Sequence, residues 1–102
     1  MRRHQENQDA TLRQSEAAPD FSSAAPLHEL GLTSREAEVL LWVAQGKANY
    51  DVATLLGMSE KTVKIHLGHI FEKLNVETRT AAALMAVEKL IRSKATAVKA
   101  NQ

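Results

Sequence analysis

The pattern of apolar and polar residues along this chain changes at Leu30. From there onward, apolar residues recur every three or four positions, the spacing of one face of an amphipathic helix. Four such stretches follow one another, and the alternation that marks strands is absent. The residues before Leu30 are mostly polar or small, so they bury too little apolar surface to offset the conformational entropy lost when they are ordered. No residue up to position 26 is therefore expected in the core. The pattern predicts an all-α protein, a four-helix bundle over residues 30–94 with a disordered tail at 1–29 and a frayed end at 95–102.

Capping residues mark the ends of the first two helices. Thr33 and Glu36 have the pattern of a capping box, in which the Thr33 hydroxyl caps the first turn and Glu36 reaches back to the cap residue. Gly46 is placed for a left-handed stop after this helix. The second helix is shorter, with Asn49 expected as its cap and Gly57 as its end.

The next two helices are longer. Ser59 is expected to cap a helix over residues 60–74, and Thr78 to cap one that runs from Arg79 to about Ser93. A short helix, a three-residue turn with glycine and a longer capped helix follow the plan of a helix-turn-helix. Many small helical bundles share this plan, so the spacing alone does not decide the function.

Two residues on the outer face of the third helix are unusual for a solvated surface. Ile65 lies almost opposite the apolar arc, and Gly68 sits mid-helix at a cost of about 1 kcal/mol relative to alanine. A face that lies against DNA base edges explains both, because an exposed aliphatic side chain can pack on a thymine methyl group and glycine permits close approach. An isoleucine exposed by chance and a tolerated glycine fit the angles equally well.

Two stretches of the chain resemble a known family. Residues 32–40 (LTSREAEVL) and 59–66 (SEKTVKIH) are similar to the signature motifs of the LuxR/FixJ-type helix-turn-helix of bacterial transcription factors. Gly46, Asn49 and Ala53 also stand where that family has glycine, asparagine and alanine. The resemblance spans roughly residues 30–87, and its many fixed spacings make it specific.

The resemblance implies a sequence-specific transcription regulator that binds a near-palindromic site on double-stranded DNA as a dimer, with the third helix in the major groove. It assigns Lys64 and Ile65 to base edges, and Thr62 and His66 to the DNA backbone. The full set of expected DNA-binding residues is Asn49, Tyr50, Ser59, Lys61, Thr62, Lys64, Ile65, His66, Gly68 and His69.

The chain departs from the family pattern in several places. Gly68 replaces a basic or polar reader, Tyr50 replaces a lysine, and Ala48 replaces a serine or threonine. Family members usually carry an N-terminal receiver or small-molecule-binding domain, and residues 1–29 are too short for either. The chain is therefore expected to be a stand-alone regulator or a fragment.

The apolar arc of the fourth helix is about twice as wide as one core contact needs. A homodimer would bury the surplus, through an interface made of Ala82, Ala83, Ala86, Val87, Leu90 and Ile91. Leu84 belongs to the same arc. The alternative is that this helix is sunk between the other three.

Composition narrows the remaining possibilities. The net charge is +1, with a mild basic excess in residues 30–102, which does not identify a partner. There is no cysteine, and His66 and His69 lack a third ligand, so no metal is expected. No cofactor, no catalytic constellation and no membrane span are recognisable, and we expect a cytoplasmic, nucleoid-associated protein that is not an enzyme.

One alternative function stays open. The chain could be a protein-interaction module that pairs with a related regulator or with RNA polymerase and does not read DNA strongly. The loss of basic character at Tyr50 and Gly68, together with the acidic tail, favours this alternative.

Overall fold

A computed structural model of the protein describes residues 18–100, with side chains for residues 18–94. Every regular element in this range is a helix, which confirms the all-α prediction. The expected disorder of residues 1–17 lies outside the described residues. The elements are η1 (Ala25–Leu30), α2 (Ser34–Ala44), α3 (Asn49–Leu56), α4 (Glu60–Leu74) and α5 (Arg79–Ala100).

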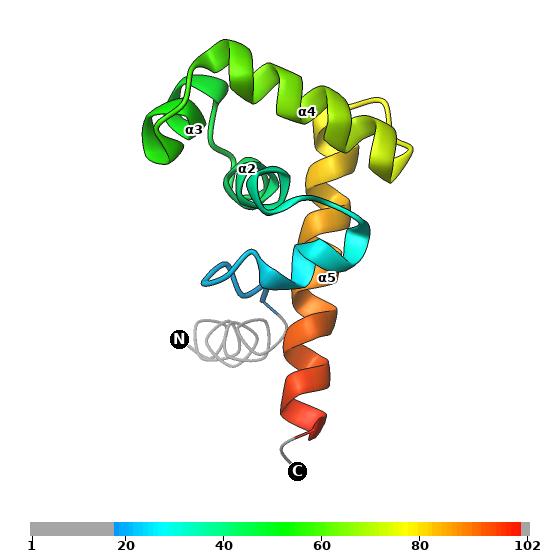
Figure 1. The fold of residues 1–102 in the computed structure, drawn as a ribbon. Helices are drawn as coiled ribbons and strands as arrows, with labels where there is room; N and C mark the ends of the chain where they lie inside the picture. Colours follow the sequence, from blue (N-terminus) through cyan, green and yellow to red (C-terminus); the bar gives the residue numbers. More distant parts are fainter. Residues whose placement is uncertain (1–17, 101–102) are drawn as a thin grey trace, which may run out of the picture.

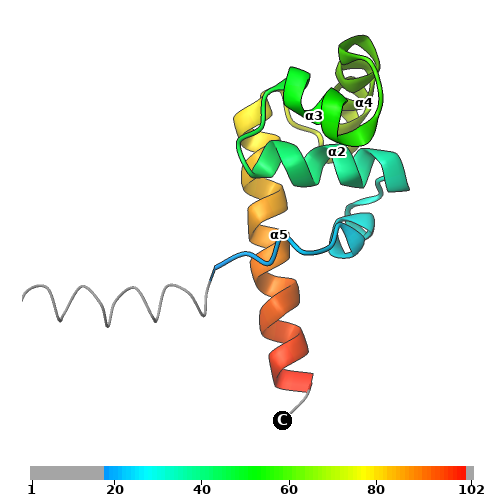
Figure 2. The same ribbon diagram turned by 90° about the vertical axis from the view of Figure 1, so that its left-hand side faces the viewer.

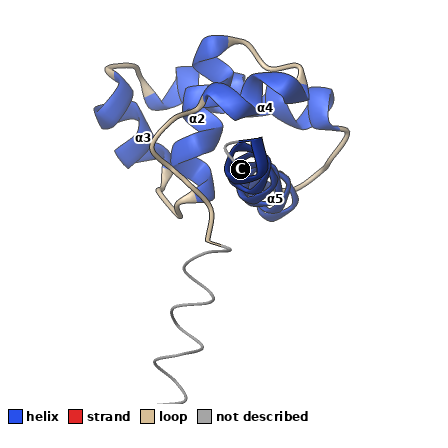
Figure 3. Ribbon diagram, turned by 90° about the horizontal axis from the view of Figure 1, so that it is seen from below, coloured by secondary structure: helices blue, strands red, loops and turns tan. Residues whose placement is uncertain are grey.

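The helices are arranged around α2. Figure 1 shows α4 across one end of the molecule, and α5 running away from it toward the C-terminus. The view in Figure 2 places α3 and α4 on one side of α2 and η1 on the other. Seen from below in Figure 3, α5 stands beside α2 and α4, with its C-terminal end toward the viewer. This arrangement leaves α4 at the periphery, with one side on the core and the other facing out.

The core is formed by apolar side chains from all five elements. In α4 the buried positions are those that helical periodicity predicts, and they share one face of the helix. The largest fully buried side chains are Leu27, Leu40, Ile70, Leu90, Val39, Val52 and Val63.

Most of the predicted helix ends are confirmed. The Thr33 Oγ1 accepts from the Glu36 amide at 3.2 Å, and the Glu36 Oε1 accepts from the Thr33 amide at 3.0 Å, which completes the capping box. Gly46 and Gly57 have positive φ after α2 and α3. The Thr78 hydroxyl accepts from the amide of Ala81 at the start of α5.

Two of these predictions are wrong. Asn49 is not the cap of α3, because Ala48 occupies that position without a side-chain hydrogen bond and Asn49 is the first helical residue. The fourth predicted helix does not end near Ser93, since α5 continues to Ala100. The sequence after Ser93 consists mainly of alanine and lysine, which favour helix, and it contains no glycine or proline to stop it.

The segment before residue 30 contributes to the core, contrary to the expectation of a tail without core contacts. Leu27 in η1 is 0% exposed, and Phe21 and Ala24 pack against the core. The Nζ of Lys89 in α5 lies 2.9 Å from the Glu29 Oε1 and ties η1 to α5. The fold therefore begins before the bundle predicted from the hydrophobic pattern.

Candidate nucleic-acid interface

The outer face of α4 is polar except at one position. Lys61, Lys64, Gly68 and His69 are exposed, and Ile65 remains 50% exposed although its side chain is large and aliphatic. Figure 1 shows this helix at the edge of the molecule, with its outer side free of the other described elements. The face thus offers cationic and apolar contacts to a partner along about two and a half turns of helix.

A buried carboxylate fixes α4 on α2. Glu36 is 3% exposed, and its Oε1 accepts from the Nζ of Lys73 at 2.7 Å. The Nδ1 of His69 lies 3.6 Å from the other carboxylate oxygen. Burial raises the pKa of the Glu36 carboxyl. The hydrogen bonds from Lys73 and Thr33 lower it by more than burial raises it, so this pKa lies below its ordinary value. Two residues of α4, one of them on its outer face, are therefore oriented by an ionised group of α2.

The end of α3 is held on α2 by Arg35. Its Nη2 donates to the carbonyl of Leu56 at 3.2 Å, and its Nη1 donates to the Glu38 Oε1 at 3.3 Å. At Gly57 the chain turns in the left-handed region, and the amide of Met58 donates back to the Ala53 carbonyl. These bonds define the turn between α3 and α4, and with it the helix-turn-helix geometry.

Ser59 and Thr62 have a structural role at the start of α4. The Ser59 Oγ accepts from the Thr62 amide at 3.0 Å and lies 2.9 Å from the Thr62 hydroxyl. His66, one turn further on, is half-buried, and its Nδ1 has no hydrogen-bond partner among the described residues. All three predicted contact residues flank the exposed face and do not lie at its centre.

The first turn of α3 carries the remaining two predicted contact residues. Tyr50 is 67% exposed. Asn49 is half-buried, and its Oδ1 accepts from the Nη1 of Arg79 at 2.6 Å. Helical spacing could not reveal this bond, because Arg79 lies in a different helix.

Comparison with known proteins places this arrangement in a family. Residues 30–86 match the family described as bacterial regulatory proteins of the luxR family, and the match covers more than half of the chain. The chain belongs to this family. Membership in a family of regulatory proteins confirms the expectation that the chain is not an enzyme.

Several curated luxR-type relatives are similar to this part of the chain. The transcriptional activator protein AnoR of Acinetobacter nosocomialis is 45% identical over 58 residues, which cover 57% of this chain and 24% of that protein. The uncharacterized transcriptional regulatory protein YhcZ of Bacillus subtilis is 51% identical over 57 residues, covering 56% and 27%. The nitrate/nitrite response regulator protein NarP of Escherichia coli is 43% identical over 58 residues, covering 57% and 27%. The matching part thus spans about a quarter of the length of these relatives.

In this luxR-family chain, α5 divides its apolar residues between two surfaces. Ala82, Ala86 and Leu90 were expected at a dimer interface, but they lie in the core of the chain itself. Among the other expected interface residues, Ala83, Val87 and Ile91 are half-buried, and Leu84 next to them is 64% exposed. A groove of about 350 Å³ runs beside this outer surface, lined by Val43, Ala44, Gly46, Arg79, Thr80, Ala83, Leu84 and Val87.

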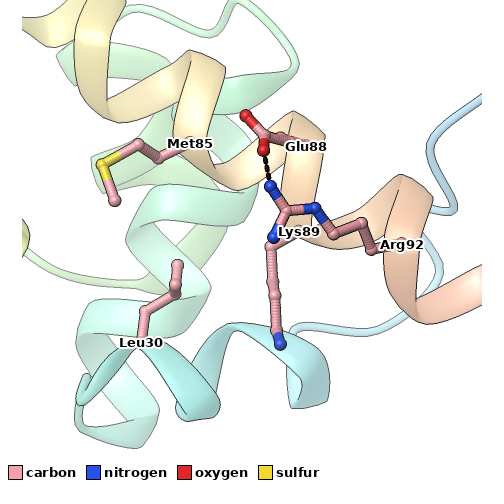
Figure 4. Close-up of a pocket in the computed structure, with 5 residues that line it drawn as sticks. All are labelled: Leu30, Met85, Glu88, Lys89 and Arg92. Atoms are coloured by element: carbon pink, nitrogen blue, oxygen red, sulfur yellow. Dashed lines mark ion pairs between the residues drawn. The ribbon is translucent and has the colours of Figure 1, made fainter.

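A second hollow lies between η1 and α5. Figure 4 shows Leu30 and Met85 on one side of it, and Glu88 paired with Arg92 on the other. Its volume of about 100 Å³ is well below the roughly 300–1,000 Å³ of small-molecule sites. In the part of the chain that the structure describes, no three His, Cys, Asp or Glu side chains gather as a metal site requires, and no helix is long and apolar enough to span a membrane.

Proposed function

We propose that this luxR-family chain is a DNA-binding transcription regulator that places α4 in the major groove. The observation that carries the proposal is the outer face of α4, where lysines and an exposed isoleucine lie on a helix fixed from behind by Glu36. Relatives similar to this chain are named as transcriptional activators or regulators. A regulator of chromosomal genes acts in the bacterial cytoplasm at the nucleoid, and we include that location in the proposal.

Individual roles follow from chemistry and position. Lys64 and Ile65 are neighbouring exposed residues of α4 and would contact base edges, the lysine at guanine and the isoleucine at a thymine methyl group. Lys61, at the start of α4, would contact a phosphate. A Cβ at Gly68 would meet nothing within 4 Å, so packing within the chain does not require glycine there. Close approach of the α4 backbone to DNA gives this glycine a reason.

Other predicted contacts are peripheral. Thr62, His66 and the capping residue Ser59 flank the exposed face, where they would meet the DNA backbone, and His69 extends the face toward its C-terminal end. Tyr50 stands exposed on α3 and would reach a neighbouring phosphate through its hydroxyl group.

The DNA-binding proposal predicts a steep dependence on salt. Affinity for random duplex DNA, measured by fluorescence anisotropy, should fall about tenfold or more between roughly 50 and 200 mM salt, the fall that two phosphate contacts alone would give. Lys61→Ala should make the slope shallower by about one. As a matched control, Lys89→Ala on α5 should leave the slope unchanged. An affinity that does not vary with salt would contradict the proposal and favour the protein-interaction alternative.

That alternative also rests on a specific observation. Tyr50, Leu55 and Leu84 are large, largely exposed apolar side chains, and such residues are common in protein interfaces. A module that pairs with a related regulator or with RNA polymerase would use these positions. Selection of bound sequences from a random DNA pool separates the two functions, because only a DNA reader enriches a defined site.

We further propose a homodimer that reads a near-palindromic site. The occupant of the groove beside Ala83 and Val87 would be α5 of a second copy, because a two-fold interface matches a two-fold site. The core position of Ala82, Ala86 and Leu90 leaves the partner to the outer residues of the helix.

The dimer proposal predicts a specific effect at Leu84. Leu84→Lys should raise the dissociation constant of the dimer by about tenfold or more, because a charge replaces an apolar contact at the centre of the interface. Leu55→Lys, the same change at an exposed leucine of α3, is the control. Sedimentation equilibrium and the stoichiometry on a two-half-site duplex measure the effect. Equal association of both variants, or a parent protein that stays monomeric on DNA, would exclude this interface.

A further inference from the structure

Arg79 ties the start of α5 to the turn between α2 and α3. Its Nη1 donates to the Oδ1 of Asn49 at 2.6 Å, and its Nη2 donates to the carbonyl of Lys47 at 2.5 Å. Arg79 is the first residue of α5 and Asn49 the first of α3, so one side chain spans thirty positions of sequence. Both residues are half-buried, so the bond is partly shielded from water.

This contact determines which way the Asn49 amide points. A guanidinium group has donors only, so the amide oxygen of Asn49 must face Arg79. The amide nitrogen then faces away, and its two N–H groups have no acceptor among the described residues.

We propose that Arg79 is a positioning residue, which orients the Asn49 amide so that its N–H groups donate to a DNA phosphate. The inference rests on the proposed DNA-binding function. Two of the five guanidinium donors are already bound to protein oxygens, and the guanidinium acts on DNA through Asn49. The contact to phosphate is made by a neutral group, so it adds affinity on every DNA sequence without releasing a counterion.

The proposal predicts equal losses from two single variants and no further loss from their combination. Asn49→Ala and Arg79→Gln should each weaken binding to DNA on the order of tenfold, the size of a hydrogen bond to a charged group. The double variant should bind like Asn49→Ala, because Arg79 has no amide left to orient. The salt slope should stay at the parent value in all three. Arg92→Gln, which removes a guanidinium elsewhere on α5, should bind like the parent.

Two results would overturn the proposal. A salt slope shallower by about one in Arg79→Gln would mean that the arginine contacts a phosphate itself. Additive losses in the double variant would mean that Arg79 acts through the general stability of the fold and not through Asn49. Thermal unfolding of each variant is recorded in parallel.

Asn49→Asp covers the case in which Arg79→Gln does not fold. The carboxylate keeps the partner of Arg79 and makes that bond charge-assisted, so the fold is retained. It also replaces the N–H groups by an oxygen that repels phosphate, so binding should fall further than in Asn49→Ala. An Asn49→Asp variant that binds DNA like the parent would overturn the proposal.

A measurement without DNA separates this inference from the function on which it rests. In ¹⁵N spectra of the free protein, Arg79→Gln should shift the side-chain amide signals of Asn49, while Arg92→Gln should leave them in place. Unchanged Asn49 signals would refute the positioning role even if the parent binds DNA. Failure of the parent chain to bind any duplex would instead refute the proposed function, and the DNA contact of Asn49 with it.

Discussion

Lys64→Ala is expected to weaken binding to the selected DNA site by about 1–3 kcal/mol, which is roughly 5-fold to 150-fold. Lys64 lies on the exposed face of α4, so its side chain is available to a base edge and the substitution leaves the core intact. Equilibrium titration on the cognate duplex and on a scrambled duplex measures the effect. The loss should be confined to the cognate duplex, because a lost base contact removes discrimination as well as affinity.

Comparing the loss of affinity on the cognate and scrambled duplexes shows whether Lys64 contacts a base or a phosphate. A loss that is equal on both duplexes, with a salt slope shallower by about one, would assign Lys64 to a phosphate instead. Ile65→Ala should cost less and should relax the preference for thymine at one position. Lys89→Ala serves as the matched control for the loss of one positive charge. If the Lys64 and Ile65 variants are folded and bind the cognate site like the parent, α4 is not the reading helix.

Leu27→Ala should lower the free energy of unfolding by about 2–5 kcal/mol, a large part of the stability of a domain this small. Leu27 is fully buried among side chains of the bundle, so the substitution leaves a cavity that the surrounding helices cannot fill completely. Urea unfolding followed by circular dichroism measures the change. Leu55→Ala, the same substitution at an exposed position, should stay within about 0.5 kcal/mol of the parent.

The Leu27 experiment separates two descriptions of the N-terminal segment. Under the prediction from sequence, residues before Leu30 form a tail, and the Leu27 and Leu55 variants should be equally stable. If Leu27 is packed in the core as in the structure, only the Leu27 variant loses stability. A loss below about 1 kcal/mol would favour the tail.

The helices could be predicted well wherever their signals are local. The bounds of α4 agree with the prediction, because a serine cap, a regular apolar face and a change of pattern after Leu74 all lie within the helix or next to it. The capping box of α2 is equally local. The segment η1 has a proline at its start and Gly31 after its end, but its two leucines are too few to show a periodic face. Leu27 is identified as a core residue only by the helices that surround it.

The exposed face of α4 could be predicted from the sequence, but the hydrogen bonds that join the site to other helices could not. The exposed positions of α4 follow from the same angles that define its core side. The Lys73 to Glu36 bond joins residues 37 positions apart, and the Arg79 to Asn49 bond joins residues 30 apart, so neither produces a pattern in sequence. On α5, the width of the apolar arc indicated two contacts but could not show which residues faced the chain's own core.

The burial of Leu27 also bears on recombination between regulators. The family match begins at residue 30, whereas the packed unit includes a side chain three positions earlier. A hybrid regulator joined at residue 30 would contain the helix-turn-helix without Leu27. The domain fused before it would then have to supply an apolar side chain to fill the space that Leu27 occupies in the core. A junction placed before Phe21 keeps both Phe21 and Leu27 in the hybrid. The segment that must be transferred to keep the domain intact is therefore longer than the segment that matches the family.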